Sequence, residues 1–458
     1  MQSFFSDAHE GLVELASLIS HAFVSVREKS EASISIEDLP NEMLASIFES
    51  ACQYGDSFLD GHVATNIACV SKRWKMIVYS VPQIWKGFEL QQSSKAIDTR
   101  LSRVGEVGLE VGLGEYFTTE ESSTPKIPRF LGQLLPYSRQ WESLRLVVLR
   151  MNTASADQFF KTIRDNCGAL ELPRLRTLII NRTVDSEFMV DGVVDNVDLH
   201  LYSSWDMPAL ENLHITGFIP HHCFGASLLS CSIFLENEVA NVTSLFNFLG
   251  TLTRLRELEL RLVTFDESSW PDASINLSSL RKLKIDFGRS EPYYASKFVS
   301  LLDIPNISDL HLSASVAIWT HLHTLLDCFR GGKRYESLRS FTIDLKRNTA
   351  FFDQFINMMF ESFPNLEHFD ISAYDKLNAD ASSVVQCPPL KTLRFRECNA
   401  FNGSVMSRIL ERLDRCGRLE KFKKLEVVDC PTFEFSKVDK LIKSAKLKGK
   451  IDWKNYCY

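Results

Sequence analysis

Residues 280–285 read LRKLKI: a leucine, two variable positions, a second leucine, one more variable position and an isoleucine. Leu283, Lys284 and Ile285 alternate between apolar and charged side chains, and such alternation predicts a short strand with one buried face. The same spacing recurs along the chain, so the class of fold follows from this hexapeptide pattern more than from any single residue.

Nine further copies of the pattern surround this stretch. They begin at Trp141, Leu175, Leu210, Leu255, Ile307, Leu338, Leu366, Leu390 and Phe422. The segment from Leu109 to Leu113 reads as a degenerate first copy, and Ile451 with Trp453 reads as a final edge strand. Steps between copies vary from 24 residues, at 366–390, to 45 residues, at 210–255. Self-similarity at such a period indicates a solenoid.

Helical stretches lie between the copies. Phe352, Phe355, Met358 and Met359 give one apolar face, and Val405, Ile409, Leu410 and Leu413 give another. One strand and one helix per repeat predict an α/β horseshoe over residues 91–458, with parallel strands inside and helices outside. The alternative is an ordinary α/β fold with leucine-rich strands, which has no reason to repeat one spacing ten times.

Residues 34–90 have the pattern of a small helical module. An apolar set, Met43, Leu44, Ile47 and Phe48, follows Leu39-Pro40 at helical spacing, and a second stripe comprises Ile67, Val70, Trp74 and Ile77. Pro82 ends the second helix, and Ile84-Trp85 add an apolar anchor. Before this module, residues 1–33 are predicted to form a short amphipathic helix and a linker.

Composition excludes several classes of protein. The 458 residues are 45% hydrophobic and 24% charged, which is a globular composition. The net charge of −7 argues against a chain that binds nucleic acid as a whole. We find no signal peptide and no apolar run long enough to span a bilayer. The eleven cysteines are scattered without a CxxC pair, which favours reduced thiols and a cytoplasmic or nuclear location.

No pattern of catalytic or metal-binding residues stands out. The cluster His221-His222-Cys223 lacks the paired spacing of a zinc site, as does the group His321, His323 and Cys328. No phosphate-binding lysine follows the glycines between Gly105 and Gly114, and no nucleophile elbow or HExxH sequence occurs. The lysines after residue 437 are interpreted as the polar face of a last helix; a polybasic patch is the alternative. We therefore expect no enzyme activity, metal or cofactor.

Two stretches of the helical module resemble the F-box. They read IEDLPNEMLASIFESACQYGD at 36–56 and NIACVSKRWKMIVYSVPQIWKGFEL at 66–90. The positions that match the F-box pattern are Leu39, Pro40, Glu42, Ile47, Phe48, Val70, Ser71, Trp74, Ile84 and Trp85. The loop at 52–66 is longer than usual, a departure that also occurs in fungal F-box-like sequences. The repeats likewise resemble the leucine-rich repeats of F-box proteins, with Cys398 and Cys430 at the position where Asn or Cys ends the pattern.

This resemblance implies a substrate receptor of an SCF-type cullin-RING ubiquitin ligase. The ten matched positions would then bind a Skp-family adaptor and, through it, a cullin. From the residues themselves we expect an exposed apolar patch that comprises Leu39, Pro40, Ile47, Phe48 and Trp85, although Trp74 is equally consistent with a core position. A scaffold acting outside ubiquitination shares every one of these features and is the alternative function.

The substrate would bind the inner face of the strands. Side chains between the buried leucines point to that face, because strand residues alternate. The predicted row comprises His214, Glu259, Arg261, Lys284, Asp286, His311, Thr342, Asp370, Arg394, Arg396 and Glu426. It is polar and mixed in sign, which suits a protein ligand; a merely solvated face is the alternative. Arg261, Arg394 and Arg396 are able to receive a phosphate, although nothing in the sequence requires one.

Overall fold

The structure is a computed structural model that divides into two compact units. It describes residues 36–53, 63–116, 126–151, 153–184, 197–221, 224, 227–314, 335–345, 355–373, 387–398, 403–430 and 450–454. The first unit holds the described residues up to Asn181 together with 197–209, and the second holds Arg182–Val184 and the described residues from Leu210 onward. The two units are described separately below.

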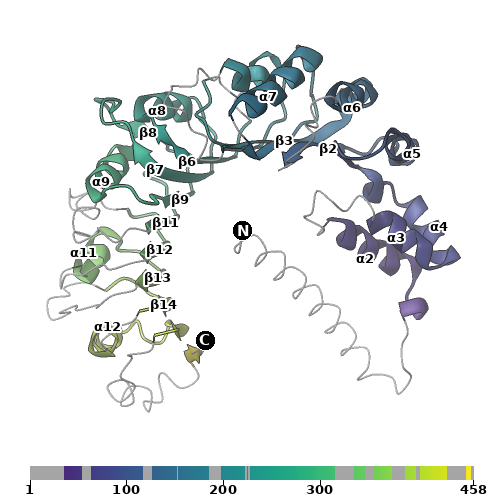
Figure 1. Ribbon diagram of the computed structural model, residues 1–458. Coiled ribbons are helices and arrows are strands. Elements are labelled where there is room, and N and C mark those ends of the chain that lie inside the picture. Colours follow the sequence, from purple (N-terminus) through teal and green to yellow (C-terminus); the bar gives the residue numbers. More distant parts are fainter. Residues whose placement is uncertain are drawn as a thin grey trace. The chain divides into compact units, whose positions relative to one another are not determined.

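The first unit begins with helices and continues with parallel strands (Figure 1). Its elements are η1 (Ile36–Asp38), α2 (Asn41–Gln53), α3 (Val63–Val70), α4 (Lys72–Ser80), η2 (Pro82–Trp85), β1 (Gly87–Glu89), α5 (Ser94–Val104), β2 (Leu109–Tyr116), α6 (Ile127–Leu134), η4 (Leu135–Gln140), β3 (Trp141–Met151), α7 (Thr153–Cys167), β4 (Thr177–Val184) and η6 (Val197–Ser204). Strands β1 to β4 are neighbours in chain order, and β2 pairs in parallel with both β1 and β3.

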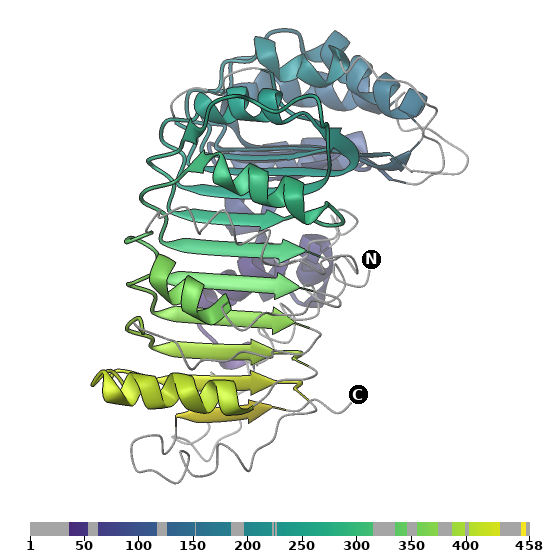
Figure 2. The same ribbon diagram turned by 90° about the vertical axis from the view of Figure 1, so that its left-hand side faces the viewer.

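The second unit is a ladder of parallel strands. Its elements are β5 (Asn212–Thr216), β6 (Ser230–Ala240), α8 (Val242–Gly250), β7 (Glu257–Phe265), β8 (Ile275–Asn276), β9 (Lys282–Asp286), α9 (Pro292–Ser300), β10 (Leu302–Asp303), β11 (Asp309–Ala314), β12 (Ser340–Leu345), α11 (Phe355–Ser362), β13 (His368–Ala373), β14 (Thr392–Arg396), α12 (Gly403–Arg415), β15 (Lys424–Val428) and β16 (Ile451–Lys454). The main sheet runs in chain order from β5 to β16, and β8 pairs only with β10. Helices α8, α9, α11 and α12 lie on the same side of these strands, as Figure 2 shows.

The apolar positions of the repeated pattern form the core between strands and helices. Leu280, Leu283 and Ile285 are buried, and the corresponding residues of neighbouring strands stand beside them in register. Because each such leucine packs within this core, truncation of its side chain to alanine lowers the free energy of unfolding by about 2–5 kcal/mol. The predicted strands are confirmed at all ten copies of the pattern, at Leu109–Leu113 and at the Ile451–Trp453 edge.

Within the β5–β16 sheet, strand β6 was not predicted from the sequence. It follows the same pattern, with Leu228, Cys231 and Ile233 at the three apolar positions, and all three are buried. Cysteine stands where the pattern has its second leucine, so a pattern based on leucine does not include this copy. The long step at 210–255 therefore contains two turns of the ladder.

Backbone hydrogen bonds repeat with the turns. The carbonyl oxygen of Arg281 accepts hydrogen bonds from the backbone nitrogens of Ser308, at 2.8 Å, and Asp309, at 3.0 Å. Arg256 and Lys391 accept the same pair of bonds from the turns that follow them. These bonds join each turn to the next without using side chains.

The two cysteines that end the pattern are buried and donate hydrogen bonds to the backbone. Cys398 is fully buried and its thiol donates to the carbonyl oxygen of Arg396 at 3.3 Å, while the thiol of Cys430 donates to that of Val428 at 3.4 Å. The residue before each cysteine has a positive φ, 55° at Glu397 and 52° at Asp429. The backbone therefore turns in the same way after β14 and after β15.

Several predicted features lie outside the described residues. These are the helix and linker at 1–33, most of the loop at 52–66, the histidines at 222, 321 and 323, and the lysine-rich helix after residue 437. The domain boundary predicted near residue 90 stays a prediction, because the division into compact units falls elsewhere, after Asn181 and after Ala209.

Candidate functional site

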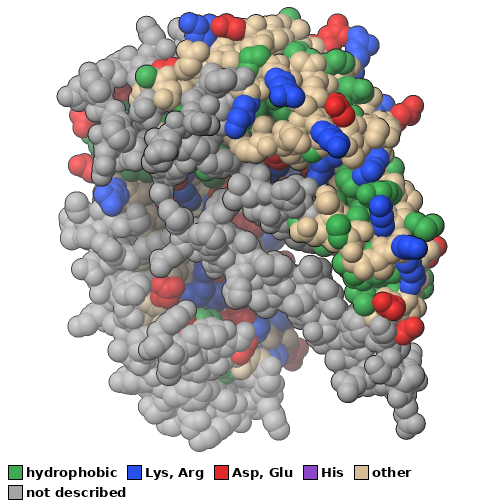
Figure 3. Space-filling model, turned by 45° about the vertical axis from the view of Figure 1, so that its right-hand side comes forward, with side chains coloured by type: hydrophobic (Ala, Val, Ile, Leu, Met, Phe, Trp, Pro, Cys, Tyr) green, Lys and Arg blue, Asp and Glu red, His purple; other side chains and the backbone are tan. Residues whose placement is uncertain are grey.

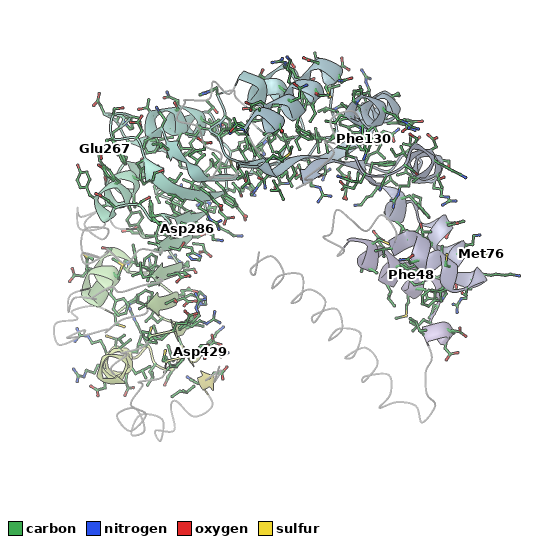
Figure 4. All side chains as sticks on the ribbon, viewed as in Figure 1. Phe48, Met76, Phe130, Glu267, Asp286 and Asp429 are labelled. Atoms are coloured by element: carbon green, nitrogen blue, oxygen red, sulfur yellow. The ribbon has the colours of Figure 1, made fainter. Side chains whose placement is uncertain are left out.

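The first candidate surface belongs to helices α2, α3 and α4. Leu44, Phe48 and Ile77 lie at their centre, and the Phe48 ring packs on Trp74 with 4.7 Å between ring centroids. Figure 4 shows Phe48 among the helices and Met76 projecting away from them. Trp74 is half-buried, so its ring serves the module's own packing.

The expectation that Phe48 and Trp85 are exposed is wrong. Their exposed fractions are 2% and 3%, and Ile84 is buried as well. The indole nitrogen of Trp85 donates to the carbonyl oxygen of Val78 at 2.9 Å, which satisfies the buried N–H. Trp85 of the matched pattern thus stabilises the module as part of its core. We expect removal of this side chain to unfold the module, and not only to reduce its apolar surface.

Trp85 also connects the module to α5. The Arg103 guanidinium lies 3.8 Å from the ring centroid of Tyr79 and 4.5 Å from that of Trp85. Cation–π contacts of this kind are worth about 0.5–2 kcal/mol each. The helices therefore pack firmly against α5, which follows directly after β1.

The start of α2 is held by Arg73. Its guanidinium donates hydrogen bonds to the carbonyl oxygens of Glu37 and Leu39, and its Nε donates to Asn41 Oδ1 at 2.9 Å. Leu39 is half-buried and Pro40 is exposed. Sequence reasoning missed Arg73, because an arginine on a helix face gives no sign that it reaches back more than thirty residues.

The remaining matched positions take different roles. Glu42 is exposed in the first turn of α2, and Ile47 is half-buried on the same helix. Ser71 caps α4 by accepting a hydrogen bond from the backbone nitrogen of Trp74 at 3.1 Å. Val70 is 62% exposed.

Two exposed methionines add to this apolar surface. Met43 on α2 is 50% exposed and Met76 on α4 is 73% exposed. Hydrophobic side chains lie interspersed with Lys and Arg side chains over this part of the chain, at the right of Figure 3. These exposed apolar side chains are available for contact with a partner.

The comparison with known families decides what this module is. Residues 36–91 match the family model described as F-box-like. These residues form an F-box-like domain. F-box domains generally bind Skp-family adaptors. No curated protein matches the chain.

The second candidate surface is the side of the β5–β16 sheet that faces away from the helices; we call it the polar face. Parallel pairing aligns its side chains in three rows. Row A comprises Asn212, Ser230, Glu257, Lys282, Asp309, Ser340, His368, Thr392 and Lys424. Row B comprises His214, Ser232, Glu259, Lys284, His311, Thr342, Asp370, Arg394, Glu426 and Asp452. Row C comprises Thr216, Phe234, Arg261, Asp286, Ser313, Asp344, Ser372, Arg396 and Val428.

The polar face holds every residue predicted to contact a substrate. His214, Glu259, Lys284, His311, Asp370 and Arg394 lie in row B, whereas Arg261, Asp286 and Arg396 lie in row C. In Figure 4, Asp286 lies on the side of the sheet opposite Glu267. The alignment of these residues is therefore a structural fact, whereas their contact with a substrate stays a prediction.

Ion pairs join neighbouring strands across the polar face. Lys282 Nζ lies 2.7 Å from Glu257 Oε1, and Lys284 Nζ lies 2.7 Å from Glu259 Oε1. These pairs follow from the register, because in-register partners on adjacent strands stand about 5 Å apart. Their side chains are partly solvated, so each pair adds little stability.

The two histidines of row B, His214 and His311, are partly buried. Burial lowers the pKa of His214, whose ring meets Phe234 edge-on at 4.7 Å. Burial also lowers the pKa of His311, with a further contribution from Lys284. Both imidazoles are therefore biased toward the neutral form.

Two hollows lie in the polar face between rows A and B. One, of about 260 Å³, spans β6 to β11 and is lined by residues of rows A and B and by the strand residues between them. The other, of about 440 Å³, spans β12 to β15 and is lined in the same way. Because β11 and β12 are neighbours, the two hollows lie end to end.

Two features are absent from the described part of the chain. None of its helices has both the length and the apolar character needed to cross a bilayer. Among the same residues, no three histidine, cysteine or carboxylate side chains are grouped to hold a metal ion.

Proposed function

We propose that the chain is the substrate-recognition subunit of an SCF-type cullin-RING ubiquitin ligase. The F-box-like domain at 36–91 carries this proposal, because such domains generally bind Skp-family adaptors. Pro40, Met43 and Val70 supply apolar surface for the adaptor. The remaining matched side chains shape and support that surface.

The polar face would hold the protein substrate. We infer that the ladder of strands is a leucine-rich-repeat solenoid of the kind found in fungal F-box proteins, with its polar face as the concave side. Solenoids commonly bind their partners on such a surface. Aligned rows of polar side chains with two hollows between them support this assignment.

In this proposal the chain performs no chemistry. It brings a substrate near a charged ubiquitin-conjugating enzyme, and transfer is accelerated by the raised effective concentration. No cofactor is required for that role. We propose a cytoplasmic or nuclear location, where the partners of such a ligase operate.

The direct test is a pull-down of the purified chain with a Skp-family adaptor. A Leu39→Ala, Pro40→Ala double variant should lose binding, because both side chains lie at the start of α2. Tyr293→Ala is the matched control, since Tyr293 is 58% exposed on α9 in the second unit. Absence of adaptor binding by well-folded wild-type chain would contradict the proposal.

The second candidate function is an interaction scaffold outside ubiquitination. It makes the same contacts with the adaptor but none with a cullin. Co-purification of the chain with both adaptor and cullin supports the ligase, whereas adaptor without cullin supports the scaffold.

A further inference from the structure

The polar face shows how a substrate would lie on it. The two hollows run end to end across β6, β7, β9, β11, β12, β13, β14 and β15. At a strand spacing of about 4.8 Å, they extend over roughly 34 Å. An extended segment of about ten residues spans that length. Two hollows that follow one another along the sheet fit an extended peptide better than a compact ligand.

The arginines and lysines whose side chains the structure describes on the polar face are already paired. Arg394 contacts both Asp370 and Glu426, and Arg396 Nε lies 3.1 Å from Asp370 Oδ1. Arg261 contacts Glu236 and Asp286 in the same way, and Lys424 Nζ lies 3.2 Å from Asp452 Oδ2.

With the two lysine–glutamate pairs of β7 and β9, these contacts account for all described Lys and Arg side chains of rows A to C. A phosphate group would have to displace a carboxylate to reach any of them. The polar face therefore disfavours a phosphorylated segment.

The middle of the polar face differs in charge from the strands on either side of it. Its residues on β11, β12 and β13 are Asp309, His311, Ser313, Ser340, Thr342, Asp344, His368, Asp370 and Ser372. We call these nine residues the central section. It contains three carboxylates but neither lysine nor arginine.

Within the described part of the chain, Asp344 is the carboxylate of the central section that has no lysine or arginine partner. Its row C neighbours are Ser313 and Ser372, and it makes no ion pair with any residue that the structure describes. Asp370, by contrast, is held by Arg394 and Arg396. Asp309 has Lys282 nearby and a hydrogen bond with Ser340.

We propose that the substrate binds the polar face as an extended, unphosphorylated segment and places a lysine or arginine over the central section, with its charge against Asp344. The inference rests on the proposed function and names the class of substrate for that surface. Small hydroxyl side chains on both sides of Asp344 leave room for a long basic side chain. A charge-assisted hydrogen bond to Asp344 then supplies specificity.

The test is selection of a displayed library of random 12-residue peptides on the full chain. Selected peptides should be enriched in lysine and arginine over aspartate and glutamate. A synthetic copy of the best peptide should lose about tenfold in affinity when its basic residue becomes glutamine. Its binding should also weaken as salt concentration rises.

A double-mutant cycle assigns the contact to Asp344. The near-isosteric variant Asp344→Asn should weaken the basic peptide about tenfold and leave its glutamine version unchanged. Thr342→Arg, which adds a cation to the central section, should weaken the basic peptide as well. Asp272→Asn, an exposed carboxylate between β7 and β8, is the matched control and should change nothing.

Three results would overturn the inference: selection of acidic or phosphate-dependent peptides, selection of none, or equal effects of Asp344→Asn on both peptides. Adaptor binding is measured on the same preparation. If the adaptor binds and the peptides are not basic, only this inference fails. If the adaptor does not bind, the proposed function fails whatever the peptides show.

Discussion

Arg73 on α4 donates a hydrogen bond to the carbonyl oxygen of Leu39, which precedes the first residues of α2. The same guanidinium reaches Glu37 and Asn41, so one side chain fixes the whole entry into the helix. The turn that presents Leu39 and Pro40 is therefore ordered before any partner arrives. A pre-ordered turn lowers the entropy cost of binding.

Removing this side chain should weaken adaptor binding without unfolding the domain. Arg73→Ala leaves the turn unrestrained, and we expect a loss of about five- to tenfold in affinity. Calorimetric titration of the adaptor measures the loss, and thermal unfolding checks the fold. Lys72→Ala, on the neighbouring exposed residue, is the control. Equal affinities of Arg73→Ala and wild-type would show that the turn needs no restraint.

Core and surface positions of the F-box-like domain should separate cleanly. Phe48→Ala removes a ring that is 2% exposed and packed on Trp74, so it should cost about 3–5 kcal/mol of stability. Pro40→Ala changes an exposed side chain and should reduce adaptor binding with little change in stability. Urea unfolding and adaptor binding, measured on both variants, test the separation. A Phe48→Ala variant as stable as wild-type would contradict the assigned packing.

Glu89 should make the stability of the first unit depend on pH. Burial raises the pKa of this carboxyl to about 7, although Arg145 lies 3.0 Å away. The unfolded chain releases the same proton near 4.5, so folding is favoured most below that pH. The stability from Glu89 is lost as the pH rises through about 7.

The variant Glu89→Gln should remove this dependence and gain about 1–3 kcal/mol above pH 7. Thermal unfolding between about pH 5 and pH 8 measures both effects. Glu171→Gln, at an exposed carboxylate, should keep the wild-type slope. An unchanged slope in Glu89→Gln would exclude the buried carboxyl as its source.

Gly217 should tolerate no side chain. Its φ is +91°, and a β-carbon there would collide with the carbonyl oxygen of Arg182. Gly217→Ala should therefore destabilise the second unit by at least about 1–3 kcal/mol. Gly132→Ala, in α6 with open space around it, should instead be neutral or gain about 0.5–1 kcal/mol. Urea unfolding compares the two, and similar stabilities would contradict the backbone clash.

The strands were predictable because one face of each had to be apolar. Leucine, isoleucine and phenylalanine at fixed offsets reveal that face directly, as at Leu338, Phe341 and Ile343. The strand at Ser230–Ala240 escaped because Cys231 fills the leucine position. A buried thiol packs as a small apolar group, but a pattern based on leucine does not count it.

The functional surfaces were harder to predict than the strands. Alternation assigned Arg394 and Asp370 to one face, but not their mutual ion pair, which depends on the register between strands. Phe48 and Trp85 were expected at the surface, because a sequence cannot distinguish an aromatic anchor for a partner from one for its own core. The role of Arg73 could not be predicted for a related reason. Its guanidinium donates to the backbone carbonyl oxygens of Glu37 and Leu39, and every residue has such an oxygen.

The repeated pair of hydrogen bonds at carbonyls such as Arg281 has an evolutionary consequence. Because backbone atoms make these bonds, the turns remain joined whichever residues occupy rows A to C. Mutation can therefore rewrite the polar face one strand at a time, while selection on folding acts mainly on the leucines behind it. A scaffold built this way can diversify its recognition rapidly and still inherit the same architecture.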